Sequence, residues 1–263
     1  MRTTLFDTPE GLGDDLAARL VASTAAAEQA GRTFLLGCPG GRSPRPVYHA
    51  MARRLAQGRH TLAHVVIVMM DDYVVQQGGG FVPVDPESHF SCRRFARDEI
   101  AAVLNAALPP DRQITTDRVW FPDPQSSATY DTRIAEAGGI DFFILASGAS
   151  DGHVAFNPQG SARDSVSRVV PLAESTRRDN MKTFPDFTTL DQVPSHGVTV
   201  GIDTIARHSK AAAMLLWGRE KQLTFQRIRA AADYDPSWPA TIIAACRNAE
   251  LLADRAAEGG HAS

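Results

Sequence analysis

Short apolar runs alternate along the chain with segments in which apolar residues recur at helical spacing. The runs predicted to be strands lie at positions 33–36, 64–70, 141–146 and 211–217. The segments predicted to be helices lie at positions 16–22, 46–55, 95–104 and 221–232. Strands and helices in alternation are typical of an α/β fold with a parallel sheet. Because the first and third runs are apolar throughout, we expect helices on both faces of that sheet.

Nothing in this alternation indicates a second domain. The 263-residue chain contains no internal repeat and no stretch long enough to be a domain linker. Gly78 to Gly80, followed by Pro83 and Pro86, predict a flexible surface loop. We therefore expect one α/β domain spanning residues 1–263, with a mostly parallel sheet flanked by helices.

The composition excludes several classes of protein. A net charge of −3 argues against a nucleic-acid protein, because affinity for nucleic acid depends on neutralising phosphates. The apolar runs are far shorter than the ~20 residues needed to cross a bilayer. Cys38, Cys92 and Cys246 are too few and too scattered for a disulfide framework, so a cytoplasmic location is expected. The sequence contains no HExxH, no GxSxG and no clustered Cys/His ligands, so neither a zinc nor a serine hydrolase is indicated.

Glycines follow the first predicted strand, at the edge where an open parallel sheet binds its ligands. The segment Gly37-Cys-Pro-Gly-Gly-Arg-Ser-Pro44 places free backbone N–H groups at the start of a helix, which suits a phosphate, and Arg42 adds a cation. Ser43 is predicted to cap this helix and Pro44 to be its first residue. A tight turn without a ligand is the alternative, since the P-loop lysine and the dinucleotide-binding spacing are both absent.

Two adjacent acids, Asp71 and Asp72, follow the second predicted strand. If the sheet edge is covered, the two carboxylates cannot both be well solvated, and one becomes a candidate base with a raised pKa. From the local pattern alone, an exposed pair of acids in a loop is the more common arrangement. We expect Asp71, directly after the strand, to face the crevice and Asp72 to point away.

Asp151 and His153 follow the third predicted strand and are separated by a glycine. This spacing lets the carboxylate set the tautomer of the imidazole, which can then move a proton near neutral pH. A lone histidine is more often structural, but its location and its partner favour a functional role here. His89, Lys182 and Lys221 are further candidates, and the two lysines could equally be solvated surface residues.

Several blocks of the sequence, taken together and in order, resemble the glucosamine-6-phosphate deaminase/isomerase family. They are GCPGGRSP, MDDY, ASGASDGHVAFN, RVVPLAESTRRDN, VTVGIDT and WGREK, from about residue 30 to residue 245. The chain also resembles, more distantly, the 6-phosphogluconolactonases of the same superfamily. The resemblance implies a modified Rossmann-type fold, a phosphorylated sugar as substrate and no dissolved cofactor.

The resemblance also implies roles for individual residues. Asp71 corresponds to the base that moves a proton between carbons 1 and 2 of the sugar. Asp151 and His153 correspond to the acid–base pair that opens the sugar ring. Lys221 matches a phosphate-binding lysine, and Lys182 stands where deaminases place a phosphate-binding arginine, without its bidentate fork. The phosphate loop would comprise Gly40, Gly41, Arg42 and Ser43, and a substrate-binding lid would include Asp72 and His89.

Two departures from the family pattern affect what we expect. Deaminases carry a glutamate after the Phe-Asn pair, and this chain has Pro158 there, so His153 lacks a second carboxylate. Val170 stands in place of a lysine of the allosterically controlled bacterial enzymes, so activation by an acetylated sugar phosphate is not expected.

We therefore expect isomerisation coupled to deamination of an aminosugar 6-phosphate. The alternatives are hydrolysis of a sugar-phosphate lactone, isomerisation of a phosphosugar without an amine, and a non-catalytic phosphosugar sensor. A phosphosugar is the expected partner, with no nucleic acid, membrane or metal. The sequence leaves open whether the chain forms a homo-oligomer.

Overall fold

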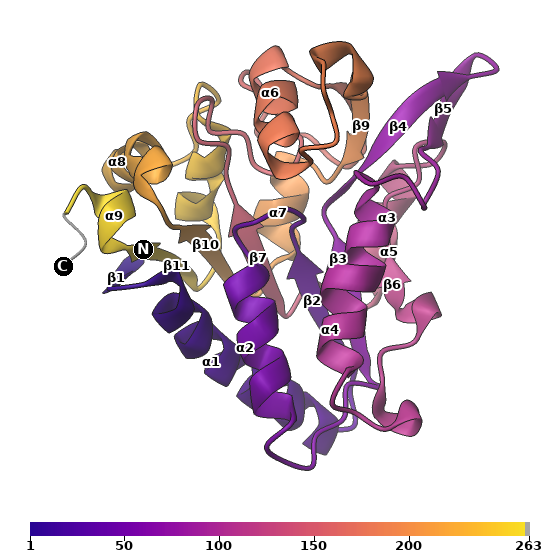
Figure 1. Ribbon diagram of the computed structural model, residues 1–263, viewed down its shortest axis with the longest axis vertical. Coiled ribbons are helices and arrows are strands. Elements are labelled where there is room, and N and C mark those ends of the chain that lie inside the picture. The colour runs from indigo at the N-terminus through magenta and orange to yellow at the C-terminus, as the bar shows by residue number, and fades with distance from the viewer. Residues whose placement is uncertain (261–263) are drawn as a thin grey trace.

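Seven parallel strands form the central sheet of the protein, in a computed structural model that describes residues 1–260 (Figure 1). Their order is β1-β11-β10-β7-β2-β3-β6, and every neighbouring pair is parallel. The strands are β1 (Arg2–Phe6), β2 (Phe34–Cys38), β3 (Val65–Met69), β6 (Val119–Trp120), β7 (Phe142–Ala146), β10 (Ala212–Leu216) and β11 (Ala249–Asp254). The four strands predicted from the apolar runs are confirmed as β2, β3, β7 and β10.

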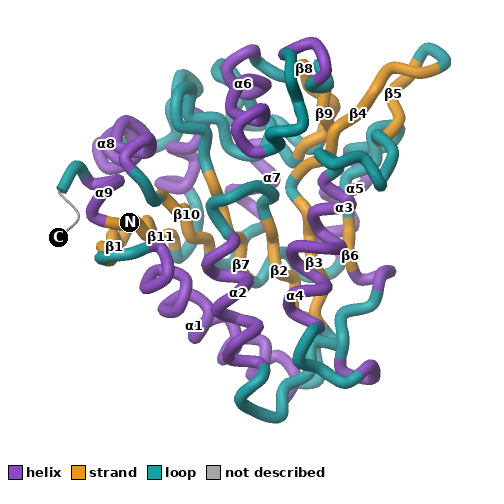
Figure 2. The backbone as a smooth tube through the Cα atoms, in the orientation of Figure 1, coloured by secondary structure: helices purple, strands orange, loops and turns teal. Residues whose placement is uncertain are grey.

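Helices cover both faces of this sheet (Figure 2). One face carries α1 (Pro9–Gln29), α2 (Arg45–Leu55) and a continuous helix made of α3 (Cys92–Phe95), a π-helical turn (Ala96–Ala101) and α4 (Ala102–Asn105). The other face carries α5 (Ala128–Glu136), α7 (Ile202–His208), α8 (Gln222–Ala230) and α9 (Arg255–Glu258). The predicted fold class, an α/β fold with a mostly parallel sheet flanked by helices, is confirmed.

Side chains of the central strands alternate between two apolar cores. In β3, Ile67 packs with the core under α1 and α2, whereas Val66 and Val68 pack with the core under α5 and α7. Successive side chains of a strand point to opposite faces, so a strand buried on both faces must be apolar at every position. This requirement explains why the uninterrupted apolar runs predicted these strands correctly.

A second, smaller sheet grows directly from the end of β3. Only Met70 separates β3 from β4 (Asp71–Gln77), which pairs antiparallel with β5 (Gly80–Pro83) and with β9 (His196–Thr199). The fourth strand, β8 (Arg168–Pro171), pairs with β9. The remaining α-helix, α6 (Glu174–Thr183), lies at the top of Figure 1, near this smaller sheet.

The glycine-rich segment predicted to be a flexible loop is instead a hairpin. Gly78 and Gly79 form the two-residue connection between β4 and β5, with φ angles of 58° and 82°. A tight turn with positive φ at both central residues matches the twist of the two strands, and glycine adopts it without steric cost. The predicted surface loop is confined to the exposed turn at Gly78 and Gly79, and the prediction was wrong for Gly80–Pro83, which form β5. The β-forming residues on both sides of the turn favour the two strands.

The two neighbouring strands at one end of the central sheet, β1 and β11, were not predicted. Their sequences, RTTLF and AELLAD, contain charged and polar residues that interrupt the apolar pattern. The charge in β11 is compensated in the fold, because the buried Glu250 accepts a hydrogen bond of 2.8 Å from Arg2 of β1 and contacts Arg19 of α1. A buried carboxylate needs such partners, and they come from the other end of the chain.

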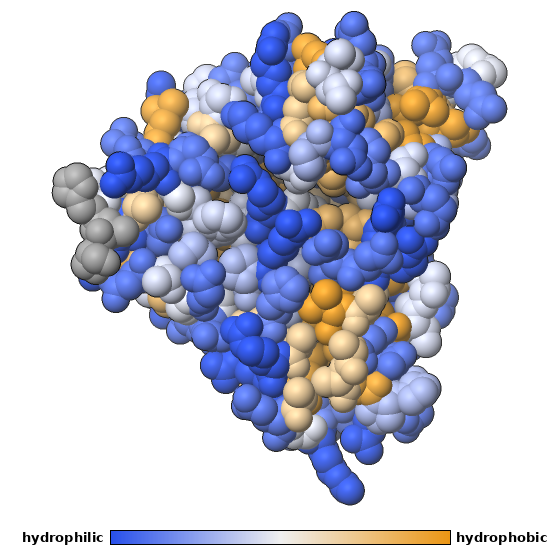
Figure 3. All heavy atoms as spheres, viewed as in Figure 1, coloured by the Kyte–Doolittle hydropathy of each residue, from blue (hydrophilic) through white to orange (hydrophobic). Residues whose placement is uncertain are grey.

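Within residues 1–260, no helix is both long enough and apolar enough to span a membrane. The face of the molecule seen in Figure 3 is mostly hydrophilic, with an apolar patch over α4.

Candidate active site

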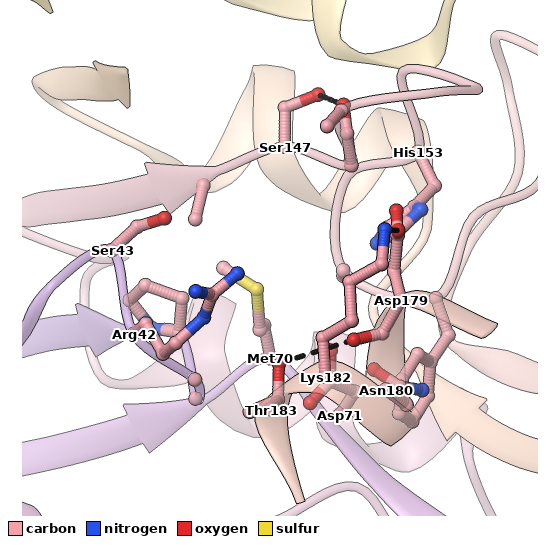
Figure 4. Close-up of a pocket in the computed structure, with 18 of the residues that line it drawn as sticks. Arg42, Ser43, Met70, Asp71, Ser147, His153, Asp179, Asn180, Lys182 and Thr183 are labelled. Atoms are coloured by element: carbon pink, nitrogen blue, oxygen red, sulfur yellow. Dashed lines mark hydrogen bonds and ion pairs between the residues drawn. The ribbon is translucent and has the colours of Figure 1, made fainter. Parts of the chain in front are cut away.

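A cavity of about 340 Å³ lies beyond the carboxyl ends of β2, β3, β7 and β10, where an open parallel sheet is expected to bind ligands. Figure 4 shows Arg42 and Ser43 on one side of this cavity and Lys182 with Asp179 on the other. The predicted site residues that line it are Gly40, Gly41, Arg42, Ser43, Asp71, His153, Lys182 and Lys221. The cavity thus collects residues from four separate strand ends and from α6.

The glycine loop after β2 forms one wall of the cavity. Gly41 has a φ angle of 81°, which a residue with a side chain adopts only with strain. The helix begins at Arg45, between the start at 46 predicted from the apolar spacing and the start at Pro44 predicted from the capping pattern. Pro44 is its N-cap, and no side chain of residues 1–260 caps it. The carbonyl of Ser43 instead accepts a hydrogen bond of 3.0 Å from the indole of Trp217, which ties this loop to the end of β10.

Asp71 and Asp72 lie on β4 and are both buried, with 6% and 0% of their surface exposed, so the exposed loop pair is wrong. They point in opposite directions, as strand geometry requires. Asp71 lines the cavity, as predicted, whereas Asp72 faces away and accepts a hydrogen bond of 2.8 Å from Arg93. Asp72 therefore does not lie over the cavity as a lid residue would.

Burial changes the proton affinity of both acids. It raises the pKa of Asp71 to about 7, helped by the neighbouring charge of Asp72 and opposed by the Cys92 thiol and by His153. It raises the pKa of Asp72 to about 6, opposed by the guanidinium of Arg93. A carboxyl with a pKa near 7 can both accept and return a proton at physiological pH.

Asp151 and His153 form the predicted acid–imidazole pair. His153 Nδ1 lies 2.7 Å from Asp151 Oδ1, and His153 lines the cavity, so the other ring nitrogen, Nε2, which has no partner within residues 1–260, can act on a ligand. Burial by itself would raise the pKa of Asp151, but the hydrogen bonds and charge of His153 and a hydrogen bond from Ser175 hold it well below its usual range. A side chain on Gly148 would collide with this pair, because its Cβ would lie 2.3 Å from His153 Nδ1.

Two hydroxyls of α6 complete the arrangement around Asp151, and no sequence pattern predicted them. Ser175 and Thr176 donate hydrogen bonds to Asp151 Oδ2 at 2.5 and 3.1 Å, and Thr176 Oγ1 also lies 3.2 Å from His153 Nδ1. The only signal was their presence in the block RVVPLAESTRRDN. No local sequence pattern in this segment indicates that it folds back over the end of β7.

Pro158, which the resemblance places where deaminases carry a glutamate, is not among the described residues that line the cavity. The preceding Asn157 is fully buried and holds the loop in place, donating hydrogen bonds to the carbonyls of Val154 and Val200 at 3.1 and 2.8 Å. Asp151 is therefore the carboxylate that contacts His153 in this chain.

The two predicted phosphate-binding lysines differ in environment. Lys221 is largely buried, which lowers its pKa, and it donates a hydrogen bond of 2.5 Å to the carbonyl of Ser147. Lys182 is 69% exposed and pairs with Asp179 at 3.1 Å. Asp179 also lines the cavity and was not predicted, so an acid lies among the cations that would bind an anionic group.

His89 lies outside the cavity lining. Its ring packs against Phe90 and Phe187, with centroid distances of 5.0 and 4.6 Å. Phe184, which does line the cavity, is 6.4 Å from His89. His89, predicted to be a lid residue, therefore belongs to an aromatic cluster that reaches the cavity through Phe184.

In the described part of the chain, no three or more His, Cys, Asp or Glu side chains are grouped so that they could hold a metal ion. The functional groups of the cavity are thus carboxyls, an imidazole, hydroxyls and cations. Together they can move protons between atoms of a ligand and hold an anion.

Comparison with known proteins identifies relatives of this chain. The sequence model of the family described as "Glucosamine-6-phosphate isomerases/6-phosphogluconolactonase" matches residues 7–252. The chain is 30% identical to a glucosamine-6-phosphate isomerase of Candida albicans over 259 residues, covering 98% of both chains. It is 34% identical to a glucosamine-6-phosphate deaminase of Rhodococcus jostii over 232 residues, covering 84% of this chain and 80% of the other.

Solved structures show the same fold. A monomeric glucosamine-6-phosphate deaminase superimposes with a TM-score of 0.81 at 24% identity, over 99% of this chain and 100% of that chain. A 6-phosphogluconolactonase of Thermotoga maritima superimposes with a TM-score of 0.66 at 17% identity, over 96% and 98%. The extent of the match to the family model and to the curated relatives, over nearly the whole chain, shows that this protein belongs to the glucosamine-6-phosphate isomerase/6-phosphogluconolactonase family.

Proposed function

We propose that the protein converts an aminosugar 6-phosphate and water into the 2-keto sugar phosphate and ammonia, as a glucosamine-6-phosphate deaminase does. The observation that carries this proposal is that Asp71, with a pKa near neutrality, faces the same cavity as the imidazole of His153. An aldose–ketose isomerisation needs a base beside carbon 2 and a separate group that opens the sugar ring. The identity with relatives that carry the deaminase and isomerase names supports the same reading.

The proposed reaction begins with ring opening. His153 Nε2 accepts the proton of the hydroxyl on carbon 1 and returns a proton to the ring oxygen as the carbon–oxygen bond breaks. Asp151 holds Nδ1 and stabilises the imidazolium that forms, through the contact of 2.7 Å.

Proton transfer between carbons follows in the open chain. Asp71 takes the proton from carbon 2, and the ammonium group on that carbon gives a proton to the carbon 1 oxygen, which leaves an enolamine with a hydroxyl on carbon 1. Asp71 then delivers its proton to carbon 1, and the product is an iminium at carbon 2. Water adds to this iminium, and ammonia leaves as ammonium, so that a ketone remains. The carboxyl of Asp71 ends in its starting state.

The substrate phosphate is assigned to the opposite wall of the cavity. The backbone of the loop Gly40 to Ser43, the guanidinium of Arg42 and the ammonium of Lys221 supply donors and positive charge there. Lys182 contributes from α6 at longer range, because it is exposed and already paired with Asp179.

The proposed functional unit is the whole chain, residues 1–263, acting as one domain in the cytoplasm. The site draws its groups from segments spread between Pro39 and Lys221, which favours a single unit. Cys38, Cys92 and Cys246 are free and buried, which suits a reducing compartment.

Hydrolysis of a sugar-phosphate lactone is the second candidate, favoured by one observation. Pro158 stands where deaminases carry a glutamate, so His153 has one carboxylate partner rather than two. In a lactonase, His153 would activate a water molecule, and Asp71 would orient the substrate.

An ammonia-release assay over a panel of hexosamine 6-phosphates, run beside a 6-phosphogluconolactonase assay, tests the proposal. We expect ammonia release from at least one aminosugar phosphate, with exchange of the carbon 2 proton into solvent. Efficient lactone hydrolysis without ammonia release would replace the proposal by the second candidate. Isomerisation of phosphosugars that carry no amine, without ammonia release from any substrate, would also contradict it.

A further inference from the structure

The two residues that begin α3 contact the two adjacent acids of β4. Cys92 Sγ lies 3.7 Å from Asp71 Oδ1, and Arg93 Nε lies 2.8 Å from Asp72 Oδ2. Ser91 caps the helix through hydrogen bonds from the backbone of Arg93 and Arg94, at 3.2 and 3.3 Å, and so fixes where Cys92 and Arg93 start. Neither Cys92 nor Arg93 has a part in the reaction described above.

We propose that the Asp72–Arg93 ion pair and the thiol of Cys92 are positioning elements that set the ionisation of the base Asp71 in opposite directions. The inference rests on the proposed function, because it assigns the proton transfer to Asp71. It adds residues that act on the base without touching the substrate carbon.

The Asp72–Arg93 pair keeps a negative charge next to the base. The side chain of Asp72 is fully buried, and its other oxygen, Oδ1, has no hydrogen-bond partner within residues 1–260. Arg93, held over the ring of Phe121 at 4.7 Å, is the counter-ion of Asp72 and the main group that favours its ionised form, with a smaller contribution from the backbone N–H groups of Tyr73 and Cys92. A buried carboxylate without a counter-ion takes up a proton. With Arg93 in place, Asp72 stays ionised, and its negative charge opposes ionisation of the adjacent Asp71.

The thiol of Cys92 acts in the other direction. Burial raises the pKa of Cys92 well above its ordinary value, so the sulfur keeps its proton and can donate it to Asp71 Oδ1. A donor to a carboxylate favours the ionised form. Asp71 is thus placed between a charge that favours its protonated form and a donor that favours its ionised form.

Other groups also face Asp71. His153 approaches from the loop after β7 and lowers its pKa, while the hydroxyl-bearing rings of Tyr73 on β4 and Tyr130 on α5 are close enough to interact with its charge. The two tyrosines stay neutral because burial raises their pKa well above the ordinary value. Apart from His153, Asp72 and Cys92 are therefore the groups that shift the pKa of Asp71, and both depend on the packing of α3 against β4.

This balance matters for the proposed reaction. The base must take the proton from carbon 2 and then give it up to carbon 1, so its pKa has to lie close to the working pH. An aspartate with an ordinary pKa would be too weak a base, and an aspartate that stays protonated could not take the proton from carbon 2.

Opposite shifts of the pH profile test the proposal. We expect Asp72→Asn to move the acid limb of kcat/KM, and of carbon 2 proton exchange, downward by about one pH unit or more, because a like charge is lost. Arg93→Met should move it the same way, because Asp72 then becomes protonated. Cys92→Ala should move it upward, and Cys92→Ser, which keeps a shorter donor, should lie between Cys92→Ala and the native protein.

Arg94→Gln is the matched control. Arg94 is on the same helix, 44% exposed and paired with Asp98, so its profile should coincide with that of the native protein. The second ionisation of the substrate phosphate, at a pH of about 6, is common to all variants and cancels in the comparison. A purely structural role for Asp72 and Cys92 would lower activity without moving the limb. An unmoved limb in Asp72→Asn, or shifts of the same sign in Asp72→Asn and Cys92→Ala, would overturn the proposal.

A direct titration separates this inference from the proposed activity. The side-chain carboxyls are followed by NMR in protein labelled with ¹³C-aspartate, with the signal of Asp71 identified by its loss in Asp71→Asn. If every substrate is inactive and the Asp71 signal still shifts as expected in the Asp72 and Cys92 variants, the proposed reaction is wrong and this inference is supported. An Asp71 titration that is the same in all variants overturns the inference whatever the activity.

Discussion

Replacing Asp151 by asparagine removes the charge that holds His153 and leaves the size of the side chain unchanged. Asp151 Oδ1 lies 2.7 Å from His153 Nδ1, and the two side chains are only 8% and 15% exposed. A hydrogen bond between charged groups in such a setting contributes roughly 1.5–3 kcal/mol. Since about 1.4 kcal/mol corresponds to a tenfold change in rate, the imidazolium formed during ring opening should become roughly 10- to 150-fold harder to reach.

This loss should be seen in kcat, with KM for glucosamine 6-phosphate nearly unchanged, because the cations of the cavity are untouched. Steady-state ammonia release measures both constants, and Asp191→Asn, an exposed acid in the turn after α6, is the control. Native turnover in Asp151→Asn would refute the role given to the pair. A rise in KM alone would show that Asp151 acts on binding rather than on ring opening.

Three further outcomes follow from the geometry. Lys221→Ala should raise KM roughly 10- to 150-fold, since a charge-assisted contact of about 1.5–3 kcal/mol is lost; an unchanged preference for phosphorylated over unphosphorylated sugars would refute its assignment. Arg42→Ala should raise KM more than Lys182→Ala, because Lys182 is 69% exposed and already paired with Asp179; the reverse order, measured in the same assay, would contradict this. Asp71→Asn should abolish carbon 2 proton exchange and yet raise Tm at about pH 8, because a carboxyl whose pKa rises from 3.8 to about 7 on folding loses stability as the pH rises between these values. Thermal melts of the two proteins should converge at about pH 4, and a lower Tm for the variant at about pH 8 would refute the raised pKa.

The position of the cavity could be predicted from the sequence because it depends on local patterns. Runs of apolar residues predict strands, and the carboxyl ends of parallel strands meet at one edge of a sheet. The residues that follow those runs, Arg42, Asp71, His153 and Lys221, do line one cavity. The order of the sequence blocks, and their resemblance to one family, added the chemistry expected there.

Contacts made by distant segments could not be predicted in this way. Ser175 and Thr176 bond to Asp151 across 24 and 25 positions of the chain, and Cys92 and Arg93 reach the acids of β4 across 21. No periodicity or spacing marks these pairs. The neighbouring strands β1 and β11 were missed for a related reason, since Glu250 becomes acceptable in a buried strand only through Arg2 and Arg19.

Asp71 and Asp72 illustrate the difference between what the sequence determines and what the tertiary structure decides. The sequence by itself determined that two acids follow a buried strand, that they point in opposite directions, and that the first of them faces the ligand edge of the sheet. Only the tertiary structure decided that both are buried, that Arg93 neutralises one and that Cys92 contacts the other. The physical reason is that strand direction follows from the backbone geometry of neighbouring residues, whereas the ionisation of a carboxyl depends on loss of water and on nearby charges. Those are set by the packing of α3 against β4, which no local pattern in the chain encodes.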